Sequence, residues 1–85
     1  MEKSALAGII DVKIEKILRM FFNNKEQLFH INKISKDTKV PVATTFRIIK
    51  KLVKLDLISY ITIGKFKVYK LNLNSKSRLL LKLLK

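Results

Sequence analysis

The sequence predicts a small α+β domain that is mostly helical, and three observations lead to this fold class. Apolar residues recur at helical spacing over residues 4–23 and again over residues 42–55, as they do in helices with one buried face. A tight turn at Val40-Pro41 precedes the second of these helices, and Gly64-Lys65 separates two β-rich runs that predict a hairpin. Because 85 residues are too few for two domains, we expect residues 1–85 to form one.

The first helix is predicted over residues 4–23, with Ser4 as its N-cap and Asn23-Asn24 at its end. A start at Asp11 is the alternative, because Gly8 would cost about 1 kcal/mol inside a helix. The main apolar face consists of Leu6, Ile10, Ile14, Ile17, Leu18 and Phe21. Three apolar residues lie off that face, namely Ile9, Met20 and Phe22. The helix therefore needs a second surface to pack against.

A short edge strand is predicted over residues 27–31, followed by a second helix over residues 32–38. Asn32 is the candidate cap of this helix, and Ile34 is expected to point into the core. His30 has no cysteine, second histidine or carboxylate cluster near it in the sequence. Since a zinc site needs several such ligands, we interpret His30 as structural and expect no metal.

The third helix begins near Pro41 or Val42 and runs to about Leu55. Proline suits the first turn, because its missing N–H would have no partner there. The residues expected on its buried face are Val42, Thr45, Phe46, Ile49, Leu52 and Val53.

The hairpin is predicted over residues 59–73, with Gly64-Lys65 as a two-residue type II′ loop. This register pairs Ile63 with Phe66, Ile61 with Val68 and Tyr60 with Tyr69. We expect the two tyrosines to pack within the sheet. A last helix follows over residues 74–85, capped by Asn74 or Ser75 and rich in leucine.

The charge of the chain points to a polyanionic partner. Nineteen Lys and Arg against six Asp and Glu give a formal charge of +13, and such a density of like charge repels itself. Nucleic acid is the first candidate and an anionic membrane surface the second. Sixteen of the basic residues are Lys, which fits an AT-rich genome and, with abundant Ile, a thermophilic archaeon or its virus.

Several classes of protein are disfavoured. There is no cysteine, so disulfides and thiolate metal sites are excluded, and no apolar run is long enough for a membrane span. The short apolar run at residues 5–10 does not make a signal peptide, so we expect a cytoplasmic protein. The scattered acidic residues, the lack of a nucleophile beside a base and the lack of a glycine-rich loop predict no enzyme, cofactor or small-molecule substrate.

Residues 35–58 predict a helix-turn-helix, and one run within them resembles a known family. The residues concerned are Thr44-Thr45-Phe46-Arg47-Ile48-Ile49-Lys50-Lys51-Leu52, followed by Leu57-Ile58 before the hairpin. With the order helix, strand, helix, turn, helix and hairpin, this run resembles the winged helix-turn-helix domain of regulators of the MarR, ArsR and PadR kind over residues 11–73. Those families usually carry Gly where this chain has Asp56, and Asp tolerates a left-handed turn.

The resemblance implies double-stranded DNA as the partner, with the helix over residues 42–55 in the major groove and the wing over residues 59–73 on the backbone or minor groove. The face of the third helix opposite its expected buried face holds Ala43, Thr44, Arg47, Lys50, Lys51 and Lys54. Arg47 is the best candidate for a base contact, because its planar fork can bond guanine at two atoms. Thr44 could meet a thymine methyl or a phosphate, and the lysines phosphates. Further candidates are Lys39 at the turn and Lys65 and Lys67 in the wing.

The two ends of the chain predict a homodimer. Both carry apolar residues beyond what a winged-helix core needs, and a two-fold dimer would bury them: Leu6, Ile9, Ile10, Leu79, Leu80, Leu83 and Leu84. The alternatives are that the last helix, residues 74–85, folds back on its own core or lies on an anionic membrane.

These observations predict a sequence-specific DNA-binding transcription regulator. The alternatives are a non-specific nucleoid-type or replication-associated DNA binder, a winged-helix protein-interaction module and, more weakly, an RNA-binding protein. A basic helical face is also a common solvated surface, so the assignment depends on the charge, the turn and the hairpin together.

Overall fold

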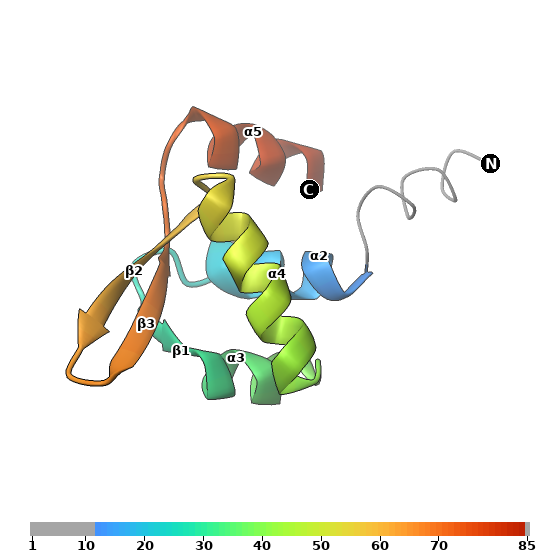
Figure 1. Ribbon diagram of the computed structural model, residues 1–85. Coiled ribbons are helices and arrows are strands. Elements are labelled where there is room, and N and C mark those ends of the chain that lie inside the picture. Colours follow the sequence, from blue (N-terminus) through green and yellow to red (C-terminus); the bar gives the residue numbers. More distant parts are fainter. Residues whose placement is uncertain (1–11, 85) are drawn as a thin grey trace.

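The computed structural model describes residues 12–84, without the side chain of Leu84 (Figure 1). Within this range the helices are α2 (Val12–Phe22), α3 (Ile31–Thr38), α4 (Val42–Lys54) and α5 (Ser75–Leu84). The strands are β1 (Phe29–His30), β2 (Ile58–Ile63) and β3 (Phe66–Leu71), which form an antiparallel sheet in the order β1-β3-β2. The predicted caps Ser4 and Asp11 and the residues Leu6, Ile9 and Ile10 lie outside the described range.

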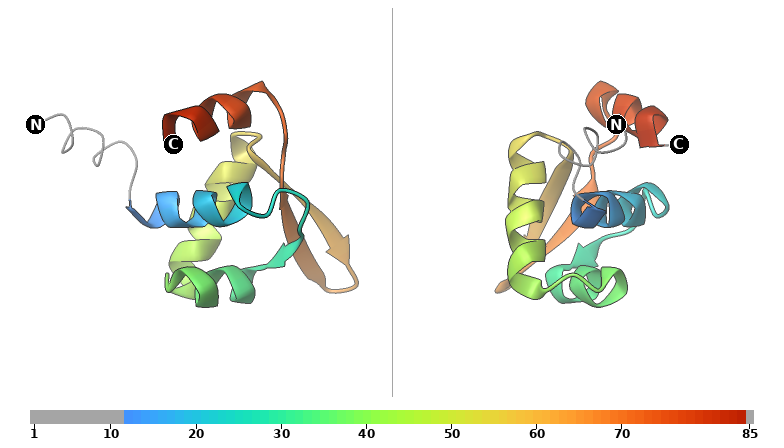
Figure 2. Two further views of the ribbon diagram at one scale, coloured as in Figure 1. Left: turned by 180° about the vertical axis from the view of Figure 1, so that it is seen from behind. Right: turned by 90° about the vertical axis from the view of Figure 1, so that its right-hand side faces the viewer.

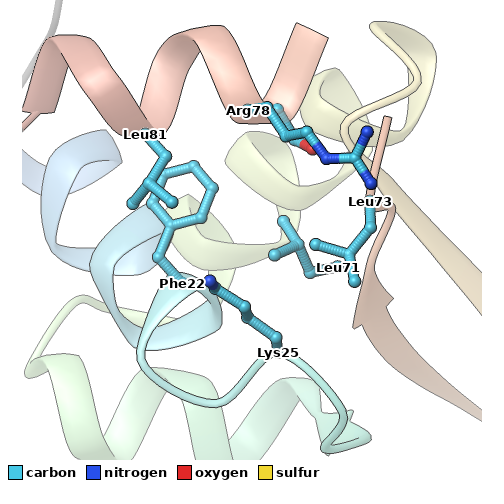
Figure 3. Close-up of a pocket in the computed structure, with 7 residues that line it drawn as sticks. Phe22, Lys25, Leu71, Leu73, Arg78 and Leu81 are labelled. Atoms are coloured by element: carbon cyan, nitrogen blue, oxygen red, sulfur yellow. The ribbon is translucent and has the colours of Figure 1, made fainter. Parts of the chain in front are cut away.

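The core lies between α2, α3, α4 and the inner face of the sheet, and the most deeply buried apolar side chains are Ile17, Phe21, Ile34, Ile49 and Ile58. The predicted face of α2 is thereby confirmed for Ile17 and Phe21, and Leu18 is buried with them. Phe22, expected off that face, is also buried, since Leu81 of α5 approaches it from the other side of α2 (Figure 3).

The second helix starts one residue earlier than predicted, and its cap is not Asn32. α3 begins at Ile31, and the His30 side chain accepts a hydrogen bond at Nδ1 from the backbone N–H of Asn32, over 3.3 Å. His30 therefore has a structural part as an N-cap. Histidine is not among the preferred caps, which is why residue preference alone pointed to Asn32.

The turn between α3 and α4 is fixed by local hydrogen bonds. Lys39 ends α3 in the left-handed conformation, at φ 59°. Val40, 2% exposed, donates its N–H to the carbonyl of Ser35 over 3.2 Å. The Val40 carbonyl in turn accepts the hydroxyls of Ser35 and Thr45, over 2.5 and 3.2 Å. These bonds set the direction in which α4 leaves the turn.

The buried face of α4 differs from the predicted one. Val42 and Phe46 are 50% and 47% exposed, whereas Ile48 is 9% exposed and joins the core with Thr45, Ile49 and Leu52. The helix is thus rotated toward Ile48, which packs in the main core cluster. Two overlapping apolar stripes exist on this helix, and hydrophobicity alone could not tell which of them faces the core.

The end of α4 has a Schellman motif. The N–H of Leu57 donates to the carbonyl of Leu52, and the N–H of Asp56 donates to that of Val53. Asp56 takes the left-handed conformation, at φ 64°. The left-handed turn that Asp56 was expected to tolerate is therefore present.

The hairpin has the predicted register, with Ile63 opposite Phe66, Ile61 opposite Val68 and Tyr60 opposite Tyr69. Gly64 has φ 60°, and Lys65 is not among the described residues with positive φ. This combination fits the predicted type II′ loop, since a type I′ loop would need positive φ at both positions.

α5 is capped by Asn74, one of the two predicted candidates. Asn74 Oδ1 accepts the N–H of Ser77 over 3.0 Å, and the Ser77 hydroxyl bonds back to the backbone of Asn74. Ser77 is 1% exposed, and Leu80 and Leu81 pack against the core. The packing is incomplete and leaves a cavity of about 220 Å³ (Figure 3) lined by Phe22, Lys25, Leu71, Leu73, Ser77, Arg78 and Leu81.

Candidate nucleic-acid interface

The exposed face of α4 carries the basic residues that the sequence singled out. α4 contains four basic residues and no acidic one. Every predicted member of this face is exposed except Thr44, which is half-buried: Ala43, Thr44, Arg47, Lys50, Lys51 and Lys54. Although α4 is rotated relative to the prediction, these residues still share one exposed face.

Arg47 and Thr44 lie side by side on the surface of α4. The Arg47 guanidinium donates from Nη2 to the Thr44 hydroxyl over 3.3 Å. A guanidinium has five N–H donors, so this single contact orients the group and leaves further donors for a ligand. An open hollow of about 340 Å³ adjoins the pair, lined by Lys13, Ile14, Thr44, Arg47, Ile48 and Lys51.

Lys13 of α2 is a basic residue that the sequence reasoning missed. It lines the same hollow as Arg47 and Lys51 although it lies 34 positions before Arg47 in the chain. Only the packing of α2 beside α4 reveals this neighbourhood. A surface for an anion would therefore extend beyond the recognition helix onto α2.

Phe46 and Val42 also belong to the exposed face of α4, where the sequence had assigned them to the core. Lys50 Nζ lies 5.8 Å from the centroid of the Phe46 ring, a cation–π distance. The exposed face consequently offers apolar atoms next to cations. Ala, Phe and similar groups are the side chains that contact thymine methyls in DNA complexes.

No carboxylate neutralises this face within the described residues. The three ion pairs of residues 12–84 join Arg19 to Glu15, Lys33 to Asp37 and Lys70 to Glu26. None involves a basic residue of α4 or the hairpin loop. The carboxylates of these three pairs therefore do not neutralise the positive charge of α4.

The other predicted basic residues flank α4. Lys39 is exposed at the turn before the helix, and Lys65 is exposed in the hairpin loop. Lys67 is exposed on β3, and its Nζ lies 4.6 Å from the centroid of the Tyr60 ring.

Figure 2 shows how these parts are arranged. In its right-hand view, α4 and the tip of the hairpin lie on one side of the molecule, and α2 and α5 lie toward the other. One approaching surface can therefore meet α4 and the hairpin tip together.

The Tyr60 and Tyr69 rings pack against each other in the sheet, with centroids 6.0 Å apart, as predicted. Tyr69 is 4% exposed. Its burial, and to a smaller degree the charge of Tyr60, raises the pKa of the Tyr69 hydroxyl above its ordinary value.

The predicted dimer residues divide into three groups. Leu79 and Leu83 are 61% and 70% exposed, and they line an open hollow with Leu55 and Leu57. Leu80 packs partly against its own core, so the alternative of a helix that folds back holds for one side of α5. The side chain of Leu84, with Leu6, Ile9 and Ile10, lies outside the described residues.

Residues 12–84 contain no group of three or more His, Asp or Glu that could hold a metal ion. No helix in the same range has the length and hydrophobicity to cross a membrane.

No protein-family model matches the sequence, and no curated protein matches it either. Solved structures that resemble it include a bacterial and an archaeal protein. A ferric uptake regulator from Francisella tularensis, solved with iron, has a TM-score of 0.72 and 18% identity, covering 78% of this chain and 55% of that chain. A possible transcriptional regulator from Methanosarcina mazei Go1 has a TM-score of 0.63 and 20% identity, covering 80% of this chain and 61% of that chain.

This chain spans less than two thirds of the length of either neighbour, and at these identities the likeness establishes the fold alone. The predicted winged helix-turn-helix is thereby confirmed. The neighbours are described as regulators, but they do not point to the MarR, ArsR or PadR kind in particular.

Proposed function

We propose that this protein is a sequence-specific double-stranded DNA-binding transcription regulator that acts as a homodimer. α4 enters the major groove, and the hairpin acts as a wing on the neighbouring backbone or minor groove. The observation that carries the proposal is the exposed face of α4, which has four basic residues, no acidic residue and no ion pair within residues 12–84.

The residues of α4 have different parts in this proposal. Arg47, held beside Thr44, reads a base edge, and Lys50, Lys51 and Lys54 bind phosphates without reading sequence. Lys13 adds a phosphate contact from α2. As a dimer joined through Leu79 and Leu83, the protein would present two α4 helices roughly 34 Å apart to a pseudo-palindromic site.

A selection of bound sequences from random DNA tests the proposal. An enriched motif with two half-sites about one helical turn apart supports a dimeric regulator. If a random duplex then competes as well as the selected one at about 150 mM salt, specificity is absent and the proposal fails.

Two variants separate base reading from phosphate binding. Arg47→Ala should cost about 1–3 kcal/mol of binding and relax the preference at one base position. Lys54→Ala is the matched control on the same helix face. It should weaken binding to all duplexes equally. The slope of the logarithm of affinity against the logarithm of salt concentration should become shallower by about 1. Unchanged specificity in Arg47→Ala would refute its base-reading part.

A non-specific nucleoid-type DNA binder is the second candidate. The net charge of +13 favours it, since lysines bind phosphates regardless of sequence. This candidate predicts the same salt dependence but no enriched motif in the selection.

A further inference from the structure

The outer face of the hairpin carries an exposed apolar patch that the proposed function does not use. Side chains alternate between the two faces of a strand. Ile58, Tyr69 and Leu71 face the core and are at most 4% exposed. The opposite face presents the outer apolar patch, defined as Ile61, Ile63, Phe66 and Val68.

The patch is most exposed at the tip of the hairpin. Ile63 and Phe66 face each other across the Gly64-Lys65 loop and are 58% and 61% exposed. The Phe66 ring packs against the His30 ring, and their centroids lie 5.4 Å apart. His30 is itself tied to the first turn of α3 through the hydrogen bond to Asn32. The contact with His30 therefore holds the Phe66 side chain in place at the tip.

The charges around the patch favour a polyanion as its partner. Lys65 lies in the loop and Lys67 follows Phe66, while residues 57–85 contain no acidic residue. The carboxylate that reaches the hairpin among the described ion pairs is Glu26, which pairs with Lys70 at the end of β3 away from the tip. A second copy joined at the tip would therefore bring Lys65 and Lys67 of both hairpins together. Such like-charge contacts are unfavourable, whereas phosphates on either side of the tip would neutralise both lysines.

The position of the tip favours DNA among polyanions. The tip lies on the same side of the molecule as α4 (Figure 2). A duplex held by α4 in its major groove therefore passes beside the tip. Apolar side chains of this kind, Phe and Ile included, wedge between base steps from the minor groove and kink the duplex.

We propose that Ile63 and Phe66 form an apolar wedge that enters the minor groove beside the α4 site, partly unstacks one base step and bends the duplex. Lys65 and Lys67 bind the phosphates that flank this step. This inference rests on the proposed DNA-binding function and adds indirect readout to it. Flexible steps such as TA unstack at lower cost than stiff A-tracts, so the wedge would select sequence without hydrogen bonds to bases.

The test measures the bend of a selected duplex by energy transfer between dyes at its two ends. The wild-type complex should be bent by roughly 20–90°, and the double variant Ile63→Ser with Phe66→Ser should leave the duplex nearly straight. Ile61→Ser is the matched control, since Ile61 is 52% exposed on the same face but farther from the tip. It should keep the bend.

A second measurement compares the affinity for two duplexes. A TA step at the wing position should bind more tightly than an A-tract at the same position, and the double variant should lose this preference. Specific binding without a bend, or a bend that persists in the double variant, overturns the wedge and leaves the DNA-binding proposal intact. Absence of specific binding overturns both.

The same variants test a protein contact at the patch. If the double variant changes the molar mass in light scattering while the bend stays as in the wild type, the patch joins proteins and the wedge is wrong. An unchanged molar mass with a lost bend supports the wedge.

Discussion

Asn74 donates a hydrogen bond from its side-chain Nδ2 to the backbone carbonyl of Asp56, over 2.8 Å. The same side chain caps α5 through its Oδ1. One residue therefore joins the start of α5 to the left-handed turn that ends α4. The Asn72 amide adds a bond to the Asp56 carboxylate over 3.1 Å.

We expect Asn74→Ala to lower the free energy of unfolding by about 1–2 kcal/mol, because it removes an N-cap and a bond to a turn carbonyl. Urea denaturation followed by circular dichroism measures this loss. Ser75→Ala is the control, since Ser75 is exposed and was the other candidate cap in the sequence. A loss at Ser75 equal to that at Asn74 would contradict this assignment.

Phe46 should read a thymine methyl in the selected DNA. Replacing each thymine in turn by deoxyuridine removes only the methyl group. The wild type should lose affinity at one position, by about 1 kcal/mol for a buried methyl-sized group, and Phe46→Ala should not distinguish the two bases there. Val42→Ala is the comparison, as Val42 is exposed one turn before Phe46 on α4. If Phe46→Ala still discriminates thymine from deoxyuridine, the contact belongs to another residue.

The double variant Leu79→Ser with Leu83→Ser should convert a dimer into a folded monomer. Both side chains are more than half exposed, so their loss removes contact area without opening the core. Light scattering measures the molar mass, and circular dichroism checks the fold. Lys82→Ala, on the exposed side of α5, should stay dimeric. A variant that still dimerises would place the interface elsewhere.

Tyr69 should make the fold sensitive to alkaline pH. Its pKa is raised in the folded state, so the neutral hydroxyl is favoured there and the unfolded chain loses this proton first. The neutral Tyr69 hydroxyl therefore contributes fully to the free energy of unfolding below the ordinary tyrosine pKa of about 10. This contribution disappears as the pH rises through the raised pKa. Tyr69→Phe cannot ionise.

Urea denaturation at about pH 8 and about pH 11 should therefore show a smaller loss of stability in Tyr69→Phe than in the wild type. Tyr60→Phe should have a smaller effect, because burial rather than the charge of Tyr60 is the main cause of the shift. Equal losses in wild type and Tyr69→Phe would show that other groups determine the alkaline limit.

The parts of the fold that could be predicted from sequence depend on local chemistry. Gly64 permits the positive φ of a type II′ loop, and this loop fixes the register of every pair in the hairpin. Asp56 is one of the few residue types that accept a left-handed turn, so its place at the end of α4 was also foreseeable.

The missed parts depend on contacts between distant segments. The rotation of α4 is set by the packing of Ile48 into the core, so Phe46 was assigned to the wrong face. Lys13 joins the candidate interface only because α2 lies beside α4. His30 acts as a cap through a ring nitrogen, which residue preferences do not anticipate.

The three ion pairs of the described residues lie away from α4, and this determines how salt acts on the protein. Dissolved ions screen the repulsion among the lysines of α4, which form no ion pair within residues 12–84. The melting temperature of the free protein should therefore rise with salt. The same ions weaken phosphate binding. A single salt titration should thus raise the melting temperature and lower the DNA affinity. At low salt, added duplex should neutralise the lysines with its phosphates and raise the melting temperature.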